Sequence, residues 1–355
     1  MRILIISPSL DPLKNVSGIS SAVNNILKFG GNQYFHFELG SSDANKDENT
    51  FKKTLRLVSA FFSYILFLKK VNPDIVHMNV PTDRNGILRE FAILRINKLF
   101  RKKIIVHLHG GEFLMKVPQS RMLTYMFKKI LSKADKVLAL SEIERQGLSD
   151  LYNFDEAEVL YNGVDTDLRY KVVDKEKGDK INILFLGRIH ETKGVLDMIK
   201  VFDQLYREKS FKFILCGTGS LVEYAVDSLS SLMKDDFVYK GIVSGEDKHT
   251  AIYESDIFLL PSHFEGLPMS LLEVMAVGVV PVITNVGSVT DVVCDGENGI
   301  IIEKSNPENI YIKLKSLLEN PEQMKGLSIN ARKTVEERYD VRHMVAKLED
   351  IYSLI

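Results

Sequence analysis

The stretch that decides the fold covers residues 257–283 and reads IFLLPSHFEGLPMSLLEVMAVGVVPVI. Its first four residues are apolar and predict a buried strand that ends before Pro261, and Pro268 then stands where a helix can begin. Glu265 lies in the turn, and Glu273 lies about a turn and a half inside the predicted helix. Open α/β sheets bind ligands where a strand ends beside a helix N-terminus. The stretch therefore predicts two carboxylates at one ligand site.

A second stretch, residues 181–194, reads INILFLGRIHETKG and places two cations after another predicted strand. Gly187 occupies the turn, and Arg188 and Lys193 follow it. An Arg side chain can form two hydrogen bonds to phosphate oxygens and a Lys ammonium supplies a point charge, so the pair suits a pyrophosphate. Cations for phosphate together with carboxylates for hydroxyls describe a site for a nucleotide sugar.

The order of these motifs resembles glycosyltransferase family 4, which contains retaining enzymes of the GT-B fold. G-R-x(4)-K-G covers residues 187–194, and E-x(7)-E covers residues 265–273. Weaker signs follow in the same order over nearly the whole chain: Ser17-Gly18, His107-Leu108-His109-Gly110, Asn162-Gly163-Val164-Asp165, Met275-Ala276 and Pro281-Val282. The resemblance implies an α/β protein with two Rossmann-like domains facing a central cleft, each built on a mainly parallel sheet.

Length also indicates two domains, because 355 residues are too many for one ordinary core and suit two domains of about 150–180 residues. We expect an N-terminal acceptor-binding domain over residues 1–165 and a nucleotide-sugar-binding domain over residues 166–339. A charged linker, roughly residues 165–180, joins them. A C-terminal helix at about 340–355 is expected to pack back on the first domain, as it commonly does in GT-B proteins.

Charge is divided unevenly along the chain. Residues 1–150 carry 23 Lys and Arg against 13 Asp and Glu, and the remainder carries 23 against 34, although the whole chain is close to neutral with 46 against 47. The basic first half makes an anionic membrane surface or a lipid pyrophosphate a candidate partner, with solvated helix faces as the alternative. We expect no nucleic-acid partner.

The longest apolar segment, residues 57–68, reads LVSAFFSYILFL and is too short to span a bilayer. As a helix it covers about 18 Å of a hydrocarbon core of about 30 Å. Basic residues on both sides allow it to lie in a membrane interface. A helix packed beneath the first domain explains the same pattern, and this is the interpretation we favour.

The location of the protein in the cell is predicted from the lack of a secretory signal and from the spacing of the two cysteines. The sequence shows no secretory signal, and Cys216 and Cys294 lie in apolar runs without zinc or disulfide spacing. Both are expected to be buried and reduced, which is typical of a cytoplasmic protein. A peripheral position at the inner face of the cell membrane is a further expectation.

The resemblance implies roles for the four charged residues. Arg188 and Lys193 would stabilise the charge that develops on the departing diphosphate. Glu265 would contact the sugar, and Glu273 would hold the ribose hydroxyls. The alternative for these residues is a set of solvated surface charges.

Further donor-site residues follow from the same resemblance. His109, at the end of the apolar strand IIVHLHG, would contact the donor, whereas His107 is expected in the core or toward the acceptor. Where relatives often carry Gly-Phe-Gly after the first glutamate, this chain has Pro268, which lacks an N–H group. Sugar contacts are therefore expected from backbone amides near it. The positions expected to line the donor site are Gly18, Gly187, Gly217, Gly219, Gly266, Leu267 and Met269.

The implied reaction transfers a sugar from a nucleoside diphosphate to a hydroxyl of a glycan or lipid-linked acceptor in bacterial surface polysaccharide synthesis. UDP is favoured as the nucleoside diphosphate, and GDP is the alternative. The reaction proceeds with retention and needs no cofactor and no metal. The D-x-D sequence at residues 165–167 lies in the linker, and the other motifs resemble enzymes that stabilise the leaving group with cations. A nucleotide-sugar epimerase of the same fold and a non-catalytic nucleotide-sugar-binding module are the alternatives.

Overall fold

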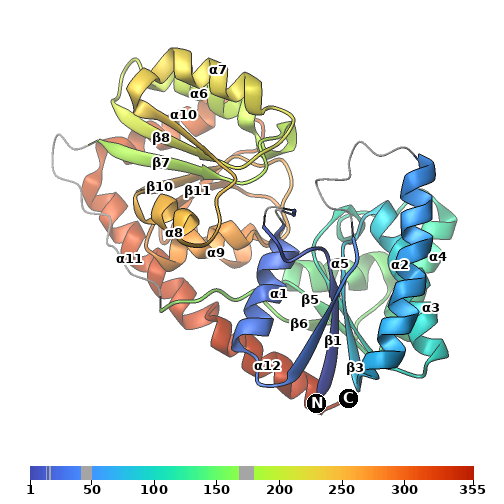
Figure 1. Ribbon diagram of the computed structural model, residues 1–355. Coiled ribbons are helices and arrows are strands. Elements are labelled where there is room, and N and C mark those ends of the chain that lie inside the picture. Colours follow the sequence, from blue (N-terminus) through green and yellow to red (C-terminus); the bar gives the residue numbers. More distant parts are fainter. Residues whose placement is uncertain (13, 16, 41–49, 168–179) are drawn as a thin grey trace. The chain divides into compact units, whose positions relative to one another are not determined.

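The computed structural model describes the chain except for residues 13, 16, 41–49 and 168–179, and it leaves out the side chains of residues 50–57 (Figure 1). The described residues form two compact units. The first unit consists of Met1–Gly163 together with Val341–Ile355, and the second unit is Val164–Asp340. Most of the predicted linker lies outside the described residues. Each unit is considered by itself.

The first unit is built on a six-stranded parallel sheet. The strands follow the order β2-β1-β3-β4-β5-β6. Their bounds are β1 Arg2–Ser7, β2 Gln33–Glu38, β3 Ile75–Val80, β4 Lys103–Leu108, β5 Lys136–Ala139 and β6 Glu158–Val159. The helices are α1 Gly18–Phe29, α2 Thr50–Val71, α3 Arg84–Leu99, η2 Glu112–Leu114, α4 Arg121–Lys133, α5 Glu142–Tyr152 and α12 Val341–Ser353.

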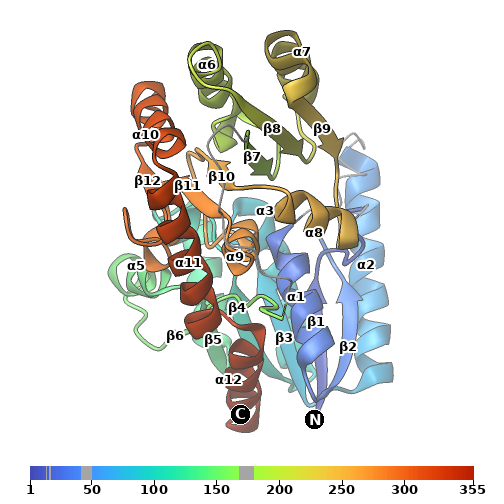
Figure 2. The ribbon, with the colours of Figure 1, turned by 90° about the vertical axis from the view of Figure 1, so that its left-hand side faces the viewer.

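Both faces of this sheet are covered by apolar side chains, as a parallel sheet requires. Successive residues of a strand point to opposite faces. Accordingly, Leu4 and Ile6 of β1 join the core beneath α2–α5, whereas Ile3 and Ile5 join a core shared with α1 and α12. The C-terminal helix α12 thus completes the first unit, beside α1 (Figure 2).

The second unit repeats the design with the strand order β12-β11-β10-β7-β8-β9, again parallel throughout. The bounds are β7 Ile181–Leu186, β8 Phe211–Cys216, β9 Phe237–Gly241, β10 Ile257–Leu260, β11 Val280–Thr284 and β12 Ile300–Ile302. The helices are η3 Glu191–Lys193, α6 Val195–Leu205, α7 Val222–Met233, η4 Lys234–Asp236, α8 Gly245–Tyr253, α9 Met269–Ala276, η5 Val289–Asp291, α10 Pro307–Glu319 and α11 Pro321–Arg338. The predicted α/β class with parallel sheets is confirmed.

Strands β7 and β10 are central neighbours in this sheet, although their first residues are 76 positions apart in the sequence. From β7 the chain proceeds outward through β8 and β9, and from β10 it proceeds outward in the other direction through β11 and β12. The loops that follow β7 and β10 therefore diverge at the topological switch point. Open α/β sheets bind their ligands at such a point, outside the carboxyl ends of the strands.

Two features differ from the sequence-based expectation. Strand β2 is not predicted, and its residues are mostly half-buried at the edge of the first sheet. The expectation that Cys294 is buried is wrong: it is exposed, because the short apolar run of Val292 and Val293 leads into an exposed turn rather than a strand. Cys216 is buried at the end of β8, as expected.

The apolar segment at residues 57–68 lies within α2. Tyr64 and Leu68 pack into the core of the first unit. This face of the helix therefore lies beneath the first domain, as the favoured interpretation predicts. Among the residues that the structure describes, no helix combines the length and the apolar composition that a bilayer crossing requires.

Candidate functional site

The loops after β7 and β10 carry an ion pair. Lys193 Nζ lies 2.5 Å from Glu265 Oε1, and Ser262 Oγ donates a hydrogen bond of 2.6 Å to the same oxygen. Glu265 is only 8% exposed, so its carboxylate depends on these partners for stability. The motif residues of two stretches that are distant in sequence therefore meet at the switch point.

Backbone contacts hold these two loops against each other. The amide of His263 donates to the carbonyl of Thr192 at 2.8 Å. Gly194 has φ +70°, and a Cβ atom there would lie 2.0 Å from the carbonyl oxygen of Pro261. Only glycine fits this close approach, which explains why it follows Lys193 directly.

Glu273 does not join this ion pair. Its Oε1 lies 2.7 Å from Nζ of Lys248 on α8, and both side chains are partly exposed. The sequence analysis missed Lys248. No motif surrounds this residue, and nothing in the sequence distinguishes it from the other charged residues of the same helix. Of the four predicted charged residues, Lys193 and Glu265 thus pair with each other, and Glu273 pairs with a lysine outside the motifs.

The fourth predicted charge, Arg188, is exposed just after the end of β7. Within the part of the chain that the structure describes, its guanidinium has no hydrogen bond or ion pair. It is therefore available to an anion from solution.

The three predicted glycines of the β7 and β8 loops lie where backbones touch. A Cβ atom on Gly217, at φ +130°, would lie 1.8 Å from the carbonyl oxygen of Gly187. A Cβ atom on Gly219 would lie 2.2 Å from the carbonyl oxygen of Ile189. These glycines bring the two loops together, and larger residues would force them apart.

The predicted amide positions surround the start of α9. Leu267 and Met269 bury their side chains, so only their backbone can face a ligand. Gly266 accepts a hydrogen bond from the amide of Ser288 at 3.2 Å, which ties this loop to the one after β11. The N-cap position of α9 is Pro268, which provides no side-chain cap, whereas its backbone carbonyl accepts a hydrogen bond from the amide of Leu271 at 3.2 Å.

The remaining two predicted residues belong to the first unit. Gly18 is the exposed first residue of α1, and Ser17 caps that helix by accepting from the amide of Ser20. His109 follows β4, and its Nε2 lies 2.7 Å from Oδ1 of Asn79 on β3. Asn79 is a second residue that the sequence analysis missed.

His109 ends a row of three histidines at the centre of the first sheet. His77 Nδ1 lies 2.6 Å from the hydroxyl of Tyr352, and His77 Nε2 lies 3.3 Å from His107 Nδ1. Burial lowers the pKa of His107 to about 3 and holds the pKa values of His77 and His109 well below their usual range. All three rings are therefore neutral near pH 7. The core alternative for His107 is confirmed.

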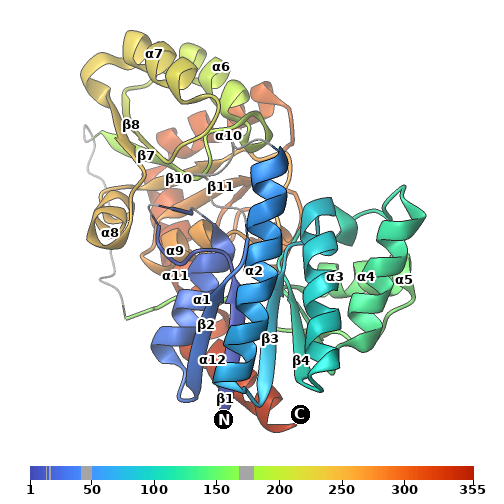
Figure 3. The same ribbon diagram turned by 45° about the vertical axis from the view of Figure 1, so that its right-hand side comes forward.

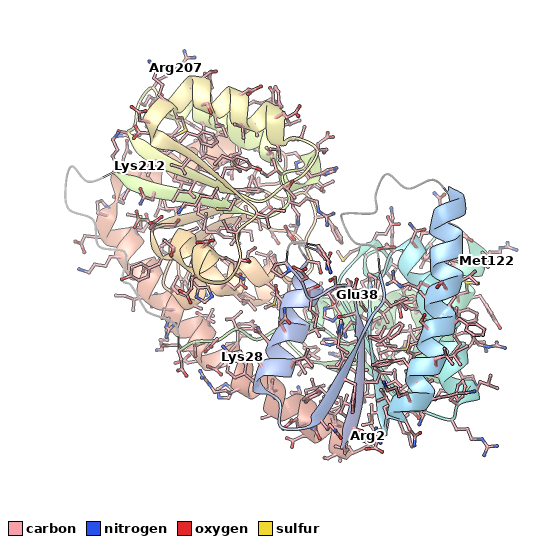
Figure 4. The ribbon with its side chains drawn as sticks, viewed as in Figure 1. Arg2, Lys28, Glu38, Met122, Arg207 and Lys212 are labelled. Carbon is pink, nitrogen blue, oxygen red and sulfur yellow. The ribbon has the colours of Figure 1, made fainter. Side chains whose placement is uncertain are left out.

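A pocket of about 630 Å³ also lies in the first unit. It is bounded by the first turns of α3 and α4 and by the segment between η2 and α4. Arg84 and Lys116 supply positive charge and Glu112 supplies negative charge, while the apolar lining includes Val117 and Met122. Met122 is labelled on α4 in Figure 4. The pocket combines apolar surface with an excess of cations.

Comparison with known proteins identifies the family. Residues 40–168 match the family described as Glycosyltransferase Family 4, and residues 168–334 match Glycosyl transferases group 1. An uncharacterized glycosyltransferase of Methanocaldococcus jannaschii is 27% identical over 309 residues, which cover 82% of this chain and 78% of that protein. The capsular polysaccharide biosynthesis glycosyltransferase CapM of Staphylococcus aureus is 24% identical over 313 residues, 83% of this chain and 80% of that protein.

A solved structure shows the same fold. HepE of Anabaena, crystallised in complex with UDP, matches with a TM-score of 0.77 at 15% identity, and the match covers 100% of both chains. The two parallel sheets described above are the two Rossmann-like domains of this fold. The chain therefore belongs to glycosyltransferase family 4 and has the GT-B fold.

Proposed function

We propose that this glycosyltransferase moves a sugar from a UDP-sugar to a hydroxyl group of a glycan or lipid-linked acceptor, with retention and without a metal. The observation that carries the proposal is the ion pair between Lys193 and Glu265 at the switch point of the second sheet. The structure of HepE with UDP and the name of CapM support a UDP-linked donor and a role in bacterial surface polysaccharide synthesis.

The two cations of the loop after β7, Arg188 and Lys193, stabilise the leaving group. As the bond between the anomeric carbon and the phosphate oxygen breaks, negative charge collects on UDP. Arg188, which is exposed and unpaired within the described residues, binds the diphosphate. Lys193 carries three N–H donors, so it can bind a phosphate oxygen while keeping Glu265 in place. These two charges take the part that a metal ion plays in other transferases.

The acidic residues bind hydroxyl groups. Glu265, fixed by Lys193 and Ser262, contacts the sugar, and Glu273 holds the ribose. Both lie on one connection, from β10 to α9, which suits binding of one ligand better than attack on a sugar from opposite faces. The acceptor hydroxyl attacks on the face that UDP leaves, and its proton passes to the departing phosphate oxygen.

The first unit would supply the acceptor site. Its pocket beside α3 and α4 offers the cations Arg84 and Lys116 next to apolar surface. Apolar surface suits a lipid chain and cations suit the phosphate that links it to a glycan. A lipid-linked acceptor fits this pocket better than a free glycan, which would need mainly polar partners.

A membrane location agrees with the outer face of α2, which no other helix or strand among the described residues of its unit covers (Figure 3). Val58, Phe62 and Leu66 are 58%, 70% and 60% exposed, and their spacing of four residues places them on one stripe. The helix contains no acidic residue and ends in Lys69 and Lys70. Apolar side chains beside lysines suit the interface of an anionic membrane.

The purified protein, incubated with UDP-sugars and a bacterial lipid extract, tests the function. UDP release that depends on the extract, with a labelled glycolipid of retained anomeric configuration, is expected. An isomerised UDP-sugar formed without extract would indicate the epimerase, and binding without turnover would indicate the binding module. Lys240→Met, which removes a lysine from the second unit at a distance in sequence from the motifs, serves as the control for Lys193→Met.

A further inference from the structure

Glu265 uses only one of its two carboxylate oxygens within the second unit. Oε1 accepts hydrogen bonds from Lys193 Nζ at 2.5 Å and from Ser262 Oγ at 2.6 Å. Oε2 has no hydrogen bond in the described part of the chain, and it is not among the enclosed unpaired side-chain atoms. The carboxylate therefore has one anchored oxygen and one oxygen that is open to a ligand.

The anchored oxygen depends on the hydroxyl group of Ser262. A carboxylate can only accept, so the single hydrogen of this hydroxyl points to Glu265. Ser262 is completely buried, two residues beyond the end of β10. The backbone of the loop after β10 must therefore be held in place if the hydroxyl is to point to Oε1.

Thr284 holds that backbone from the neighbouring strand. Strands β10 and β11 are parallel neighbours, and their paired residues end with Leu260 and Ile283. Beyond that point the hydroxyl of Thr284, the last residue of β11, donates to the carbonyl oxygen of Ser262 at 2.5 Å. The carbonyl oxygen of Leu260 lies farther away, at 3.4 Å, so the single hydroxyl hydrogen is directed to Ser262. A side chain thus continues the contact between the strands after their backbone pairing has ended.

The loop after β11 supports the same segment at its other end. A Cβ atom on Gly287, at φ +57°, would lie 1.9 Å from the carbonyl oxygen of Glu265. The next residue, Ser288, donates through its amide to the carbonyl of Gly266 at 3.2 Å. The segment that carries the carboxylate is therefore held by β11 and its loop on both sides of Glu265.

We propose that Thr284 is a positioning residue, which acts through Ser262 to fix Oε1 of Glu265 and so keeps Oε2 directed to the donor sugar. Thr284 is completely buried, so it affects a ligand only through the residues that it supports. The inference rests on the proposed function for the identity of the ligand. The support of Glu265 in the free protein does not depend on that function, and it involves the second unit alone.

Two substitutions at Thr284 test the proposal in the enzyme. Thr284→Val keeps the shape of the side chain but removes the hydroxyl, and it should lower kcat about tenfold, the effect of one lost hydrogen bond, while the affinity for UDP stays unchanged. Thr284→Ser keeps the hydroxyl and should retain most of the turnover. UDP release and titration calorimetry with UDP measure the two quantities. A Thr284→Val enzyme with the wild-type kcat, or one that loses affinity for UDP by the same factor as kcat, would overturn the proposal.

A double-mutant cycle tests whether Thr284 acts through the hydroxyl of Ser262. Thr284→Val should cause no further loss of kcat in the Ser262→Ala background. The urea concentration at the midpoint of unfolding gives a second measurement that needs no activity. Thr284→Val should lower this midpoint by less in the Ser262→Ala background, because the hydroxyl whose direction it fixes is already gone. Additive effects would overturn the proposal, whereas absence of sugar transfer would contradict the proposed function and leave the coupling in the urea measurement unchanged.

A matched control separates positioning from general stability. Ser328 of α11 is also completely buried, and its hydroxyl donates to a backbone carbonyl of the same unit, that of Gly278, at 2.5 Å. Ser328→Ala should lower the urea midpoint and leave kcat unchanged. A loss of kcat equal to that of Thr284→Val would show that any buried hydroxyl of the unit has this effect, which would contradict a specific role for Thr284.

Discussion

Lys193 and Glu265 form an ion pair, at 2.5 Å, between the loops that follow the two central strands of the second sheet. The pair has two separable consequences. It stabilises the loops, since Glu265 is almost completely buried, and it holds a cation and a carboxylate side by side at the site that we propose for the nucleotide sugar. Substitutions of one partner or of both distinguish these consequences.

Lys193→Met should lower both stability and transfer. The substitution leaves a buried carboxylate with Ser262 as its remaining side-chain partner, which should lower the free energy of unfolding by about 1–3 kcal/mol, less than for a fully buried pair because Lys193 is partly exposed. The double variant Lys193→Met/Glu265→Gln should regain most of that stability, because no unpaired charge remains. Urea unfolding and UDP release measure the two effects. A double variant with wild-type turnover would show that neither charge takes part in transfer.

Arg188→Ala should act on transfer alone. Arg188 is exposed and has no partner within the described residues, so its removal should change the free energy of unfolding by less than about 0.5 kcal/mol. Loss of a charge that stabilises the leaving group should lower kcat about 100-fold. Arg207→Ala is the control, since Arg207 is an exposed arginine of the same unit that pairs with Asp203 (Figure 4). Equal effects of the two substitutions on turnover would contradict the assignment.

The sequence predicts this part of the site because its signals are local. Apolar runs identify β7 and β10, and the charges that follow each run must lie at the carboxyl ends of parallel strands. Contact between Lys193 and Glu265 then requires only that the two strands are neighbours, as the order of the sheet makes them. The resemblance implies that these charged residues share one site, but neither it nor the periodicity of the sequence was used to predict the order of the strands.

The residues that the sequence did not reveal depend on tertiary contacts. Lys248 lies on an ordinary charged helix, and Asn79 lies inside a buried strand, so neither has a local pattern that reports its partner. Strand β2 was missed for a related reason, because an edge strand with half-buried residues lacks a continuous apolar run. For Cys294 the sequence predicted too much structure. The two valines before it resemble the start of a buried strand, but the cysteine itself is exposed.

Glu273→Gln should weaken binding of UDP and of the UDP-sugar by the same factor, about tenfold, and leave kcat nearly unchanged. A ribose contact is made equally in the ground state and the transition state, so its loss raises KM only. Titration calorimetry with UDP measures the affinity. Lys248→Met should have a smaller effect, because Lys248 acts by holding Glu273 at 2.7 Å.

Lys240→Met is the matched control for Lys248→Met. Lys240 pairs with Glu254 at 2.9 Å in the same unit and has no part in the proposed site. Its loss should leave the affinity for UDP unchanged. If Glu273→Gln lowered kcat while UDP bound normally, Glu273 would contact the reacting sugar rather than the ribose.

The buried histidines should make the first unit sensitive to acid. Burial lowers the pKa of His107 in the folded protein to about 3, below the unfolded value of about 6.5. The unfolded chain therefore takes up the proton first as the pH falls. The stability that the neutral ring gives the folded protein is therefore complete above about pH 6.5. As the pH falls from there toward about 3, the free energy of unfolding decreases by up to about 1.4 kcal/mol per pH unit.

Thermal unfolding at a series of pH values measures this dependence. His107→Gln should flatten the decrease of the unfolding temperature between about pH 6.5 and about pH 5, even if it lowers stability at neutral pH. His343→Gln, at an exposed position of α12 in the same unit, should retain the wild-type slope. A variant of His107 with an unchanged slope would show that other groups cause the acid sensitivity.

Phe62→Ser on the outer stripe of α2 should weaken binding to anionic vesicles. Insertion of a phenylalanine side chain into the membrane interface contributes about 1.5–3 kcal/mol, so its loss should lower the vesicle affinity at least tenfold. Co-sedimentation with vesicles of increasing phosphatidylserine content, at low and high salt, measures the effect. Tyr224→Ser removes an exposed aromatic residue from α7 in the second unit and should leave binding unchanged. Vesicle binding that changes with none of lipid charge, salt concentration and the Phe62→Ser substitution would exclude α2 as the membrane-facing surface. Contact with another protein would then be the explanation for the exposed stripe.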